Sequence, residues 1–166
     1  MIVKKVKTAH PFNSAIECGL RSLVILEHAF PRDYDLQRLV FYDYLLVHSG
    51  DAGGPESIHP ATPHRSGEVL VKRHILEQGL LLMMSRKLVI REYDRTGIVY
   101  QASENATPFM DGLESRYVGL LKKRAAWVIE AFDDHTDKQL DKFFQENLDR
   151  WGGEFAREAL LKHGTI

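Results

Sequence analysis

Apolar residues recur along most of this chain at the spacing of amphipathic helices. The first such segment begins with Ser14 and Glu17, which have the spacing of a capping box, and Pro31 closes it. Asp35 can cap the second segment, whose apolar stripe runs to Val47. The pattern therefore predicts two helices in the first third of the chain.

One acidic residue of the second helix, Asp43, lies four residues after Leu39 and close to the apolar stripe. Buried polar groups in folded proteins are almost always hydrogen-bonded. We therefore expect Asp43 to have a hydrogen-bond or arginine partner if it is buried.

A third helix and two strands follow between Ser66 and Ser103. Ser66 can cap the helix, whose apolar positions continue to near Ser85. Beyond it, β-forming residues flank the turn-forming sequence at 94–97. The pattern predicts a helix followed by a β-hairpin, which is the outline of a winged helix. That fold is used to bind DNA and to bind proteins, so it does not decide the function.

The last third of the chain is predicted to be helical. Thr107 precedes a proline at the favoured first helical position, and the apolar pattern extends a long helix to about Phe132, long enough to project from a small domain. Thr136 can cap another helix with one aromatic side, and a final helix carries Phe155. At the opposite end, alternating valines and lysines over residues 3–7 predict a short first strand.

These elements predict a mainly α fold with a small β-hairpin. With 166 residues and 44% apolar content, the chain has enough apolar side chains for one continuous core. We expect a winged-helix-like domain over residues 1–104, with a long loop rich in His, Pro and Gly at 48–65. Residues 105–166 would form a C-terminal helical extension that packs on this domain or on a partner.

The loop at 48–65 carries the residues best suited to chemistry: His48, Asp51, His59 and His64. Their spacing fits no zinc motif, and no pair of histidines lies on one helix face. We interpret these side chains as turn caps or partner contacts, with His59 and His64 as candidate contacts. Cys18 is the only cysteine, so an internal disulfide is impossible, and we expect it to be a buried structural residue. We predict no enzymatic activity, cofactor or metal site.

The charges are nearly balanced, with 22 basic and 23 acidic residues and a net charge of −1. A domain that binds DNA on its own has a marked basic excess. Arg65, Arg73 and Arg86 lie where a winged helix would face a duplex, and we keep them as candidate DNA or partner contacts. The alternative of a winged-helix DNA-binding regulator therefore remains open.

Aromatic residues are frequent in the C-terminal segments. Trp127, Phe143 and Trp151 are candidate anchors for a protein partner, because interfaces draw on aromatic residues. Each could instead belong to the core. No apolar run approaches the length of a membrane span, and the N-terminus lacks the apolar core of a signal peptide, so we expect no membrane contact and a cytoplasmic protein.

Four stretches carry a resemblance to a known family: Phe12–Leu23, Tyr34–Val40, Asp43–Asp51 and His59–Glu68. Together they resemble the middle component of bacterial ABC-three-component systems. The resemblance covers roughly residues 12–127, and little is recognisable beyond Asp133. It carries no catalytic assignment, so no active-site residue is transferred.

The resemblance implies an accessory subunit. Such systems pair a Rad50- or SMC-like ATPase with a small middle subunit and an effector, often a nuclease, and the Lamassu anti-phage systems are similar. The implied role is to dock on the ATPase and to couple DNA sensing to the effector, with DNA contact by this subunit left open.

Overall fold

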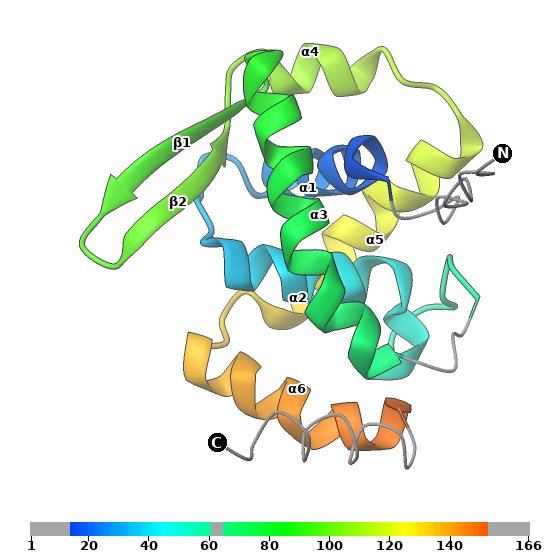
Figure 1. Cartoon of the computed structure of the whole chain (residues 1–166). Helices are drawn as coiled ribbons and strands as arrows, with labels where there is room; N and C mark the ends of the chain where they lie inside the picture. Colours follow the sequence, from blue (N-terminus) through cyan, green and yellow to red (C-terminus); the bar gives the residue numbers. More distant parts are fainter. Residues whose placement is uncertain (1–13, 61–64, 153–166) are drawn as a thin grey trace, which may run out of the picture.

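The computed structural model describes residues 14–60 and 65–152. The predicted strand over residues 3–7 and the predicted last helix around Phe155 lie outside the described residues. Most of the described chain is helical, and a single two-stranded antiparallel sheet is present in it (Figure 1). The expectation of a mainly α fold with a small β-hairpin is confirmed.

The elements follow the predicted order, except that a short 3-10 helix lies within the predicted loop and two helices replace the long helix predicted from Thr107 to Phe132. They are α1 (Ala15–Ala29), α2 (Leu36–Val47), the short 3-10 helix η1 (Ser49–Ala52), α3 (Arg65–Ser85), β1 (Val89–Asp94), β2 (Gly97–Ala102), α4 (Ala106–Asp111), α5 (Arg116–Phe132) and α6 (Asp137–Gly152).

The caps of the first two helices are those that the sequence indicates. The Ser14 hydroxyl accepts the amide of Glu17 at 3.3 Å, and the Asp35 carboxylate accepts the amide of Arg38 at 2.8 Å. The predicted cap of α3 is wrong, because the helix begins at Arg65 and Ser66 therefore lies inside it. Helix ends are the least certain part of a sequence pattern, since several neighbouring polar residues can serve as caps.

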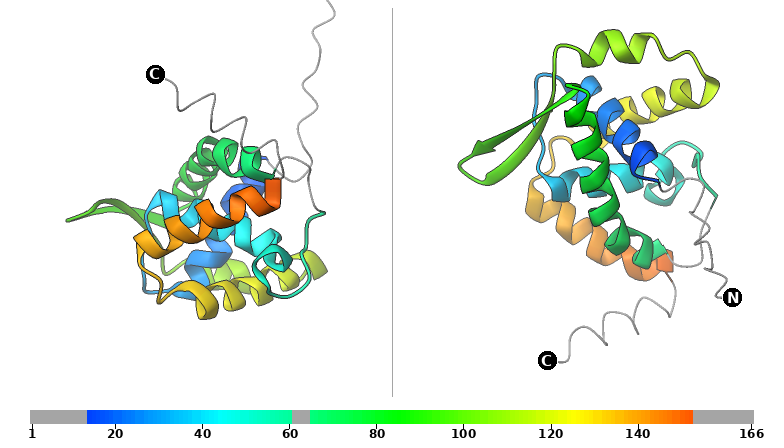
Figure 2. Two further views of the ribbon diagram at one scale, coloured as in Figure 1. Left: turned by 90° about the horizontal axis from the view of Figure 1, so that it is seen from below. Right: turned by 45° about the horizontal axis from the view of Figure 1, so that its top comes forward.

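The hairpin is closed by the turn that the sequence predicts. The Asp94 carboxylate accepts the amides of Thr96 and Gly97 at 2.7 and 3.1 Å, and Gly97 has a φ of 131°, which favours glycine. Register runs from Val89 opposite Ala102 to Asp94 opposite Gly97. The hairpin projects from the helices in all views (Figures 1 and 2).

The single long helix predicted from Thr107 to Phe132 is wrong. The chain forms α4 and α5 with a break between them, and Ser115 caps α5 by accepting the amide of Val118 at 3.2 Å. Gly112 ends α4 and the serine offers a cap three residues later, and these local signals outweigh the continuing apolar period. The helix does not project either, because α5 packs against α1 and α2.

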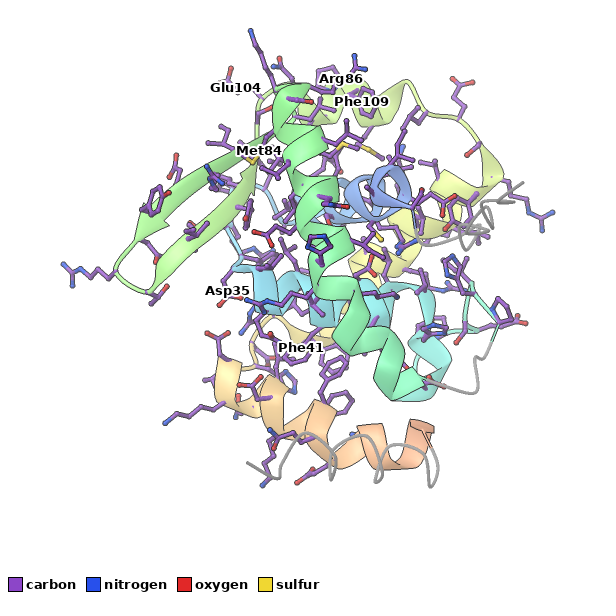
Figure 3. All side chains as sticks on the ribbon, viewed as in Figure 1. Asp35, Phe41, Met84, Arg86, Glu104 and Phe109 are labelled. Atoms are coloured by element: carbon purple, nitrogen blue, oxygen red, sulfur yellow. The ribbon has the colours of Figure 1, made fainter. Side chains whose placement is uncertain are left out.

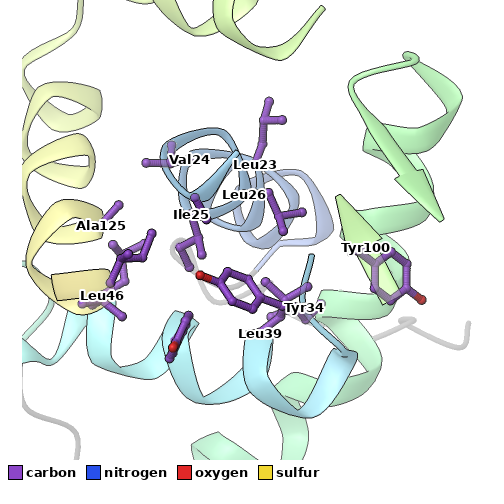
Figure 4. Close-up of a cluster of buried hydrophobic side chains, with 14 of the residues drawn as sticks. Leu23, Val24, Ile25, Leu26, Tyr34, Leu39, Leu46, Tyr100 and Ala125 are labelled. Carbon is purple, nitrogen blue, oxygen red and sulfur yellow. The ribbon is translucent and has the colours of Figure 1, made fainter. Parts of the chain in front are cut away.

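The core surrounds α1, which lies among α2, α3 and α5 (Figure 4). Four consecutive residues of α1, Leu23, Val24, Ile25 and Leu26, are at most 1% exposed. On the far side of α2, Phe41 points toward α6 and stacks on Phe144, with ring centroids 4.1 Å apart (Figure 3). Helix α6 therefore covers α2 and α3.

Candidate functional site

A fully buried ionic cluster joins the first three helices. Arg21 of α1 binds Asp43 of α2 through two hydrogen bonds, with Nε–Oδ1 and Nη2–Oδ2 distances of 2.7 and 3.2 Å. The Lys72 ammonium of α3 lies 3.2 Å from Asp43 Oδ2, the oxygen that also accepts from Arg21 Nη2. All three residues are at most 1% exposed. The expectation that a buried Asp43 has an arginine partner is confirmed.

The electrostatics of this cluster favour the charged carboxylate. Burial alone would raise the pKa of Asp43, but the charges of Arg21 and Lys72 outweigh burial and lower that pKa below its usual range. Two cations share one buried anion, so removal of the carboxylate would take this counter-charge from both of them. The cluster therefore fixes how α1, α2 and α3 are arranged.

Cys18 lies beside this cluster and is buried, as predicted. Arg21 Nη2 lies 3.2 Å from the cysteine sulfur. Burial raises the pKa of Cys18 to about 11, and the nearby Asp43 carboxylate acts in the same direction. The thiol is therefore protonated at neutral pH, which is the inert form of the side chain.

The described part of the histidine loop, residues 48–60, is tied to the helices rather than separate from them. The Tyr44 hydroxyl of α2 donates to the Asp51 carboxylate at 2.6 Å. The Arg124 guanidinium of α5 donates twice to the Glu56 carbonyl, at 2.8 and 3.1 Å. Trp127 packs its indole directly on Gly54, where an added Cβ would lie 2.2 Å from the ring. This segment therefore covers α5 and the polar cluster.

His59 lies at the inner side of that segment and is 7% exposed. Its Nε2 lies 2.9 Å from the Tyr117 hydroxyl of α5. Burial, together with the nearby charges of Arg21 and Lys72, lowers the pKa of His59 to about 4. The imidazole is therefore neutral at physiological pH and serves as a polar link between the loop and α5.

The described residues do not assemble a metal-binding group. No three His, Cys, Asp or Glu side chains within residues 14–60 and 72–147 gather closely enough to hold an ion. His48 and His59 lie with ring centroids 6.2 Å apart, and His64 lies outside the described residues. What the loop offers chemically is a set of hydrogen bonds that connect elements distant in the sequence.

A second network ties α6 to the domain and was not anticipated from the sequence. Arg38 of α2 donates to the Asp137 carboxylate at 2.9 Å and to the His135 carbonyl at 2.7 Å. Asp133 accepts hydrogen bonds from Tyr34 and Tyr42 and pairs with Arg32. Burial raises the pKa of Tyr42 to about 12. These contacts anchor the turn between α5 and α6.

The predicted contact residues are distributed over several surfaces. Arg73 is exposed on α3 and donates to Gln37 at 2.7 Å, and Arg86 is exposed just beyond the end of α3 (Figure 3). Trp127 and Phe143 are half-buried against the core, and the ring centroids of Phe143 and Phe132 are 5.3 Å apart. The side chains of Arg65 and Trp151 are not among those described. Their roles as contacts stay predictions.

Three of the seven exposed large apolar side chains of the described residues lie together on the hairpin. Tyr93 is 75% exposed, and Ile90 and Ile98 are each 42% exposed. The sequence pattern identified these residues as β-formers but did not mark them as contacts. The sequence could have indicated this exposure, because a two-stranded sheet with apolar residues on both faces cannot bury all of them by itself.

Comparison with known proteins then places the chain in a family. A model of middle component 2 of ABC-three-component (ABC-3C) systems matches residues 11–154. The chain belongs to this family. No curated protein and no solved structure matches it. The resemblance noted over residues 12–127 is thereby extended, because the matched range includes α6 and the Arg38 network that anchors it.

As a middle component of a multi-component ABC system, the chain has protein partners. None of the described helices is both long and apolar enough to cross a membrane. Within the described part, the polar clusters are internal, and the projecting hairpin carries three of the seven exposed large apolar residues, including the most exposed, Tyr93; the other four, Ile16, Phe30, Leu81 and Phe109, are spread over separate parts of the helical body. The hairpin is therefore the candidate interface of this middle component.

Proposed function

We propose that this middle component is a non-catalytic adapter of an anti-phage or anti-plasmid defence complex. It docks on an SMC- or Rad50-like ATPase, as in the similar Lamassu systems, and couples DNA sensing to a nuclease effector. Catalysis belongs to the partners. The observation that carries this proposal is the projecting hairpin, whose exposed Tyr93, Ile90 and Ile98 contribute little to the core of the chain itself.

The internal architecture supports the same role. The ionic cluster of Arg21, Asp43 and Lys72 and the hydrogen bonds of the histidine loop join α1, α2, α3 and α5 into one rigid unit. A rigid body holds an interface in a fixed position at little entropic cost on binding. An adapter that transmits a signal between two larger proteins benefits from this rigidity.

Co-expression of the chain with the ATPase and the effector of the same system tests the proposal. A tag on this chain should retain both partners, and loss of the chain should uncouple DNA-stimulated ATP hydrolysis from nuclease activity. A chain that purifies alone and leaves that coupling unchanged would overturn the proposal.

The second candidate is a winged-helix DNA-binding regulator. It is favoured by three exposed arginines: Arg73 on α3, Arg86 just beyond the end of α3, and Arg91 on the hairpin. Exposed acidic residues, Glu77, Glu92 and Asp94, are interspersed among them, which weakens the attraction to phosphates. A regulator predicts salt-dependent binding of duplex DNA by the isolated chain, abolished in the double variant R73E/R86E. If the isolated chain binds duplex DNA only weakly, and R73E/R86E binds it equally weakly, the adapter function is favoured.

A further inference from the structure

The outer edge of β1 has no strand beside it in the part of the chain that the structure describes. The sheet consists of β1 and β2 alone. On the other side, β2 is partly covered, because Tyr100 exchanges two backbone hydrogen bonds with Tyr34, at 2.8 and 3.0 Å. Five of the six residues of β1 are exposed. Figure 1 shows β1 on the side of the hairpin away from α2.

The pairing pattern identifies which groups of β1 face outward. Both backbone groups of Tyr100 point away from β1, toward Tyr34, so its cross-strand partner Arg91 belongs to a pair without mutual hydrogen bonds. The amide and carbonyl of Arg91 therefore point away from β2. Pairs alternate along an antiparallel ladder, so those of Tyr93 also point outward. Such a row of backbone donors and acceptors is a template for another strand.

The exposed side chains along this edge alternate in character. Ile90, Arg91, Glu92 and Tyr93 are apolar, basic, acidic and aromatic in turn, and all four are exposed. Directly opposed residues on neighbouring strands lie on the same face and interact, and opposite charges are favourable. The edge therefore selects a strand with an acidic and a basic residue adjacent to each other and flanked by apolar residues.

A second copy of this chain fits the edge poorly. Antiparallel self-pairing centred on Arg91 would place two Arg91 side chains opposite each other, and pairing centred on Glu92 would do the same with two carboxylates. Like charges directly opposed across strands are destabilising. The two most central registers are therefore disfavoured, and a different protein segment satisfies the charges better.

We propose that the outer edge of β1 binds an extended segment of another protein component of the system, which adds a third strand to the hairpin. In this segment an acidic residue faces Arg91, a basic residue faces Glu92, and apolar residues face Ile90 and Tyr93. The inference rests on the proposed function, since it supplies the contact by which the adapter docks.

A proline substitution tests the backbone contact without disturbing the ladder within the hairpin. R91P removes an outward amide that β2 does not use, and proline is tolerated on edge strands. R91A is the matched control, because it removes the same side chain and keeps the amide. Relative to R91A, R91P should weaken the affinity for the co-expressed partner complex at least about tenfold, since it removes a hydrogen bond and obstructs the edge.

Residue-resolved amide exchange of the unsubstituted chain gives a second readout, independent of how R91P folds. In the free chain the amides of Arg91 and Tyr93 should exchange quickly, while those of Ile90 and Glu92 are protected by the ladder. In the complex with the ATPase and effector, the Arg91 and Tyr93 amides should slow at least about tenfold, since a paired strand protects them.

Each alternative result overturns the inference in a recognisable way. Protection of both amides in the free chain at every concentration would mean that the chain covers its own edge. Protection that rises with concentration, together with a dimer mass, would mean that a second copy occupies it. If the complex forms but both amides stay unprotected, the edge is not the docking site although the adapter function stands. If no complex forms, both the proposed function and this inference fail.

Discussion

Gly19 of α1 and Gly79 of α3 meet backbone to backbone where the two helices cross. A Cβ added to Gly79 would lie 2.5 Å from the Gly19 nitrogen and 2.5 Å from the Ala15 carbonyl oxygen. Atoms of a folded backbone cannot move aside as the end of a flexible side chain can. The two glycines therefore permit the close approach on which the largest helix-to-helix contact of the described chain depends.

Gly79→Ala should lower the free energy of unfolding by roughly 2–3 kcal/mol, because the new methyl group forces the two helices apart. Urea denaturation followed by circular dichroism measures this change. Gly119→Ala is the matched control, because Gly119 lies in α5 with no atom near its Cβ position. That change should stabilise by roughly 0.5–1 kcal/mol, the helix preference of alanine over glycine. If Gly79→Ala and Gly119→Ala change the free energy of unfolding equally, α1 and α3 do not approach each other closely at Gly79.

Asp43→Asn should destabilise the chain by about 3–5 kcal/mol, since it removes the buried anion that Arg21 and Lys72 share. Urea unfolding at neutral pH measures the loss. The control is Glu146→Gln, which breaks an exposed pair with Lys142 at 3.8 Å and should cost less than about 0.5 kcal/mol. A cost for Asp43→Asn no greater than that of the control would show that the cluster contributes little to stability.

Stability should fall in mildly acidic solution because of His59. Its pKa is about 4 in the folded chain and about 6.5 when unfolded, so between these values the unfolded state binds the extra proton. The loss of unfolding free energy caused by His59 is negligible above pH 7 and grows as the pH falls, reaching about 2 kcal/mol at pH 5. Urea unfolding at pH 7.5 and pH 5 measures it. His59→Gln should remove this pH dependence, while His74→Gln, at an exposed position, should retain it.

Local signals in the sequence predicted the fold well. The caps at Ser14 and Asp35 and the turn at Asp94 each depend on hydrogen bonds that span no more than three residues. The break between α4 and α5 was missed because apolar residues keep a helical spacing across it. At this point Gly112 ends α4 and Ser115 caps α5, and the spacing of apolar residues alone does not reveal either signal.

The candidate site could be predicted less well than the fold, because its contacts join residues that are far apart in the sequence. The sequence indicated that Asp43 would need a partner but could not identify Arg21, 22 positions away. His59 was expected to cap a turn or contact a partner, yet it faces Tyr117, 58 positions away, and its exposed fraction is small. Which aromatic residues stay exposed also depends on packing between distant elements, and for this reason the exposure of Tyr93 could not be predicted from the sequence.

Tyr93 and Tyr100 provide the last test, because they lie on the same face of the hairpin but differ in exposure. Their cross-strand partners are Ile98 and Arg91, and only Tyr100 is buried, at 4% exposed against 75% for Tyr93. Tyr100→Ser should lower the free energy of unfolding by roughly 2–4 kcal/mol, whereas Tyr93→Ser should change it by less than about 0.5 kcal/mol.

The affinity for the ATPase and effector should depend on Tyr93 in spite of its small effect on stability. Exposed aromatic residues are frequent interface anchors, so Tyr93→Ser should weaken retention of the partners about tenfold. Affinity measured with the purified complex, beside urea unfolding of the same variant, separates the two effects. Full retention of the partners by a folded Tyr93→Ser chain would exclude the hairpin tip from the interface, and a large loss of stability would assign Tyr93 to the core.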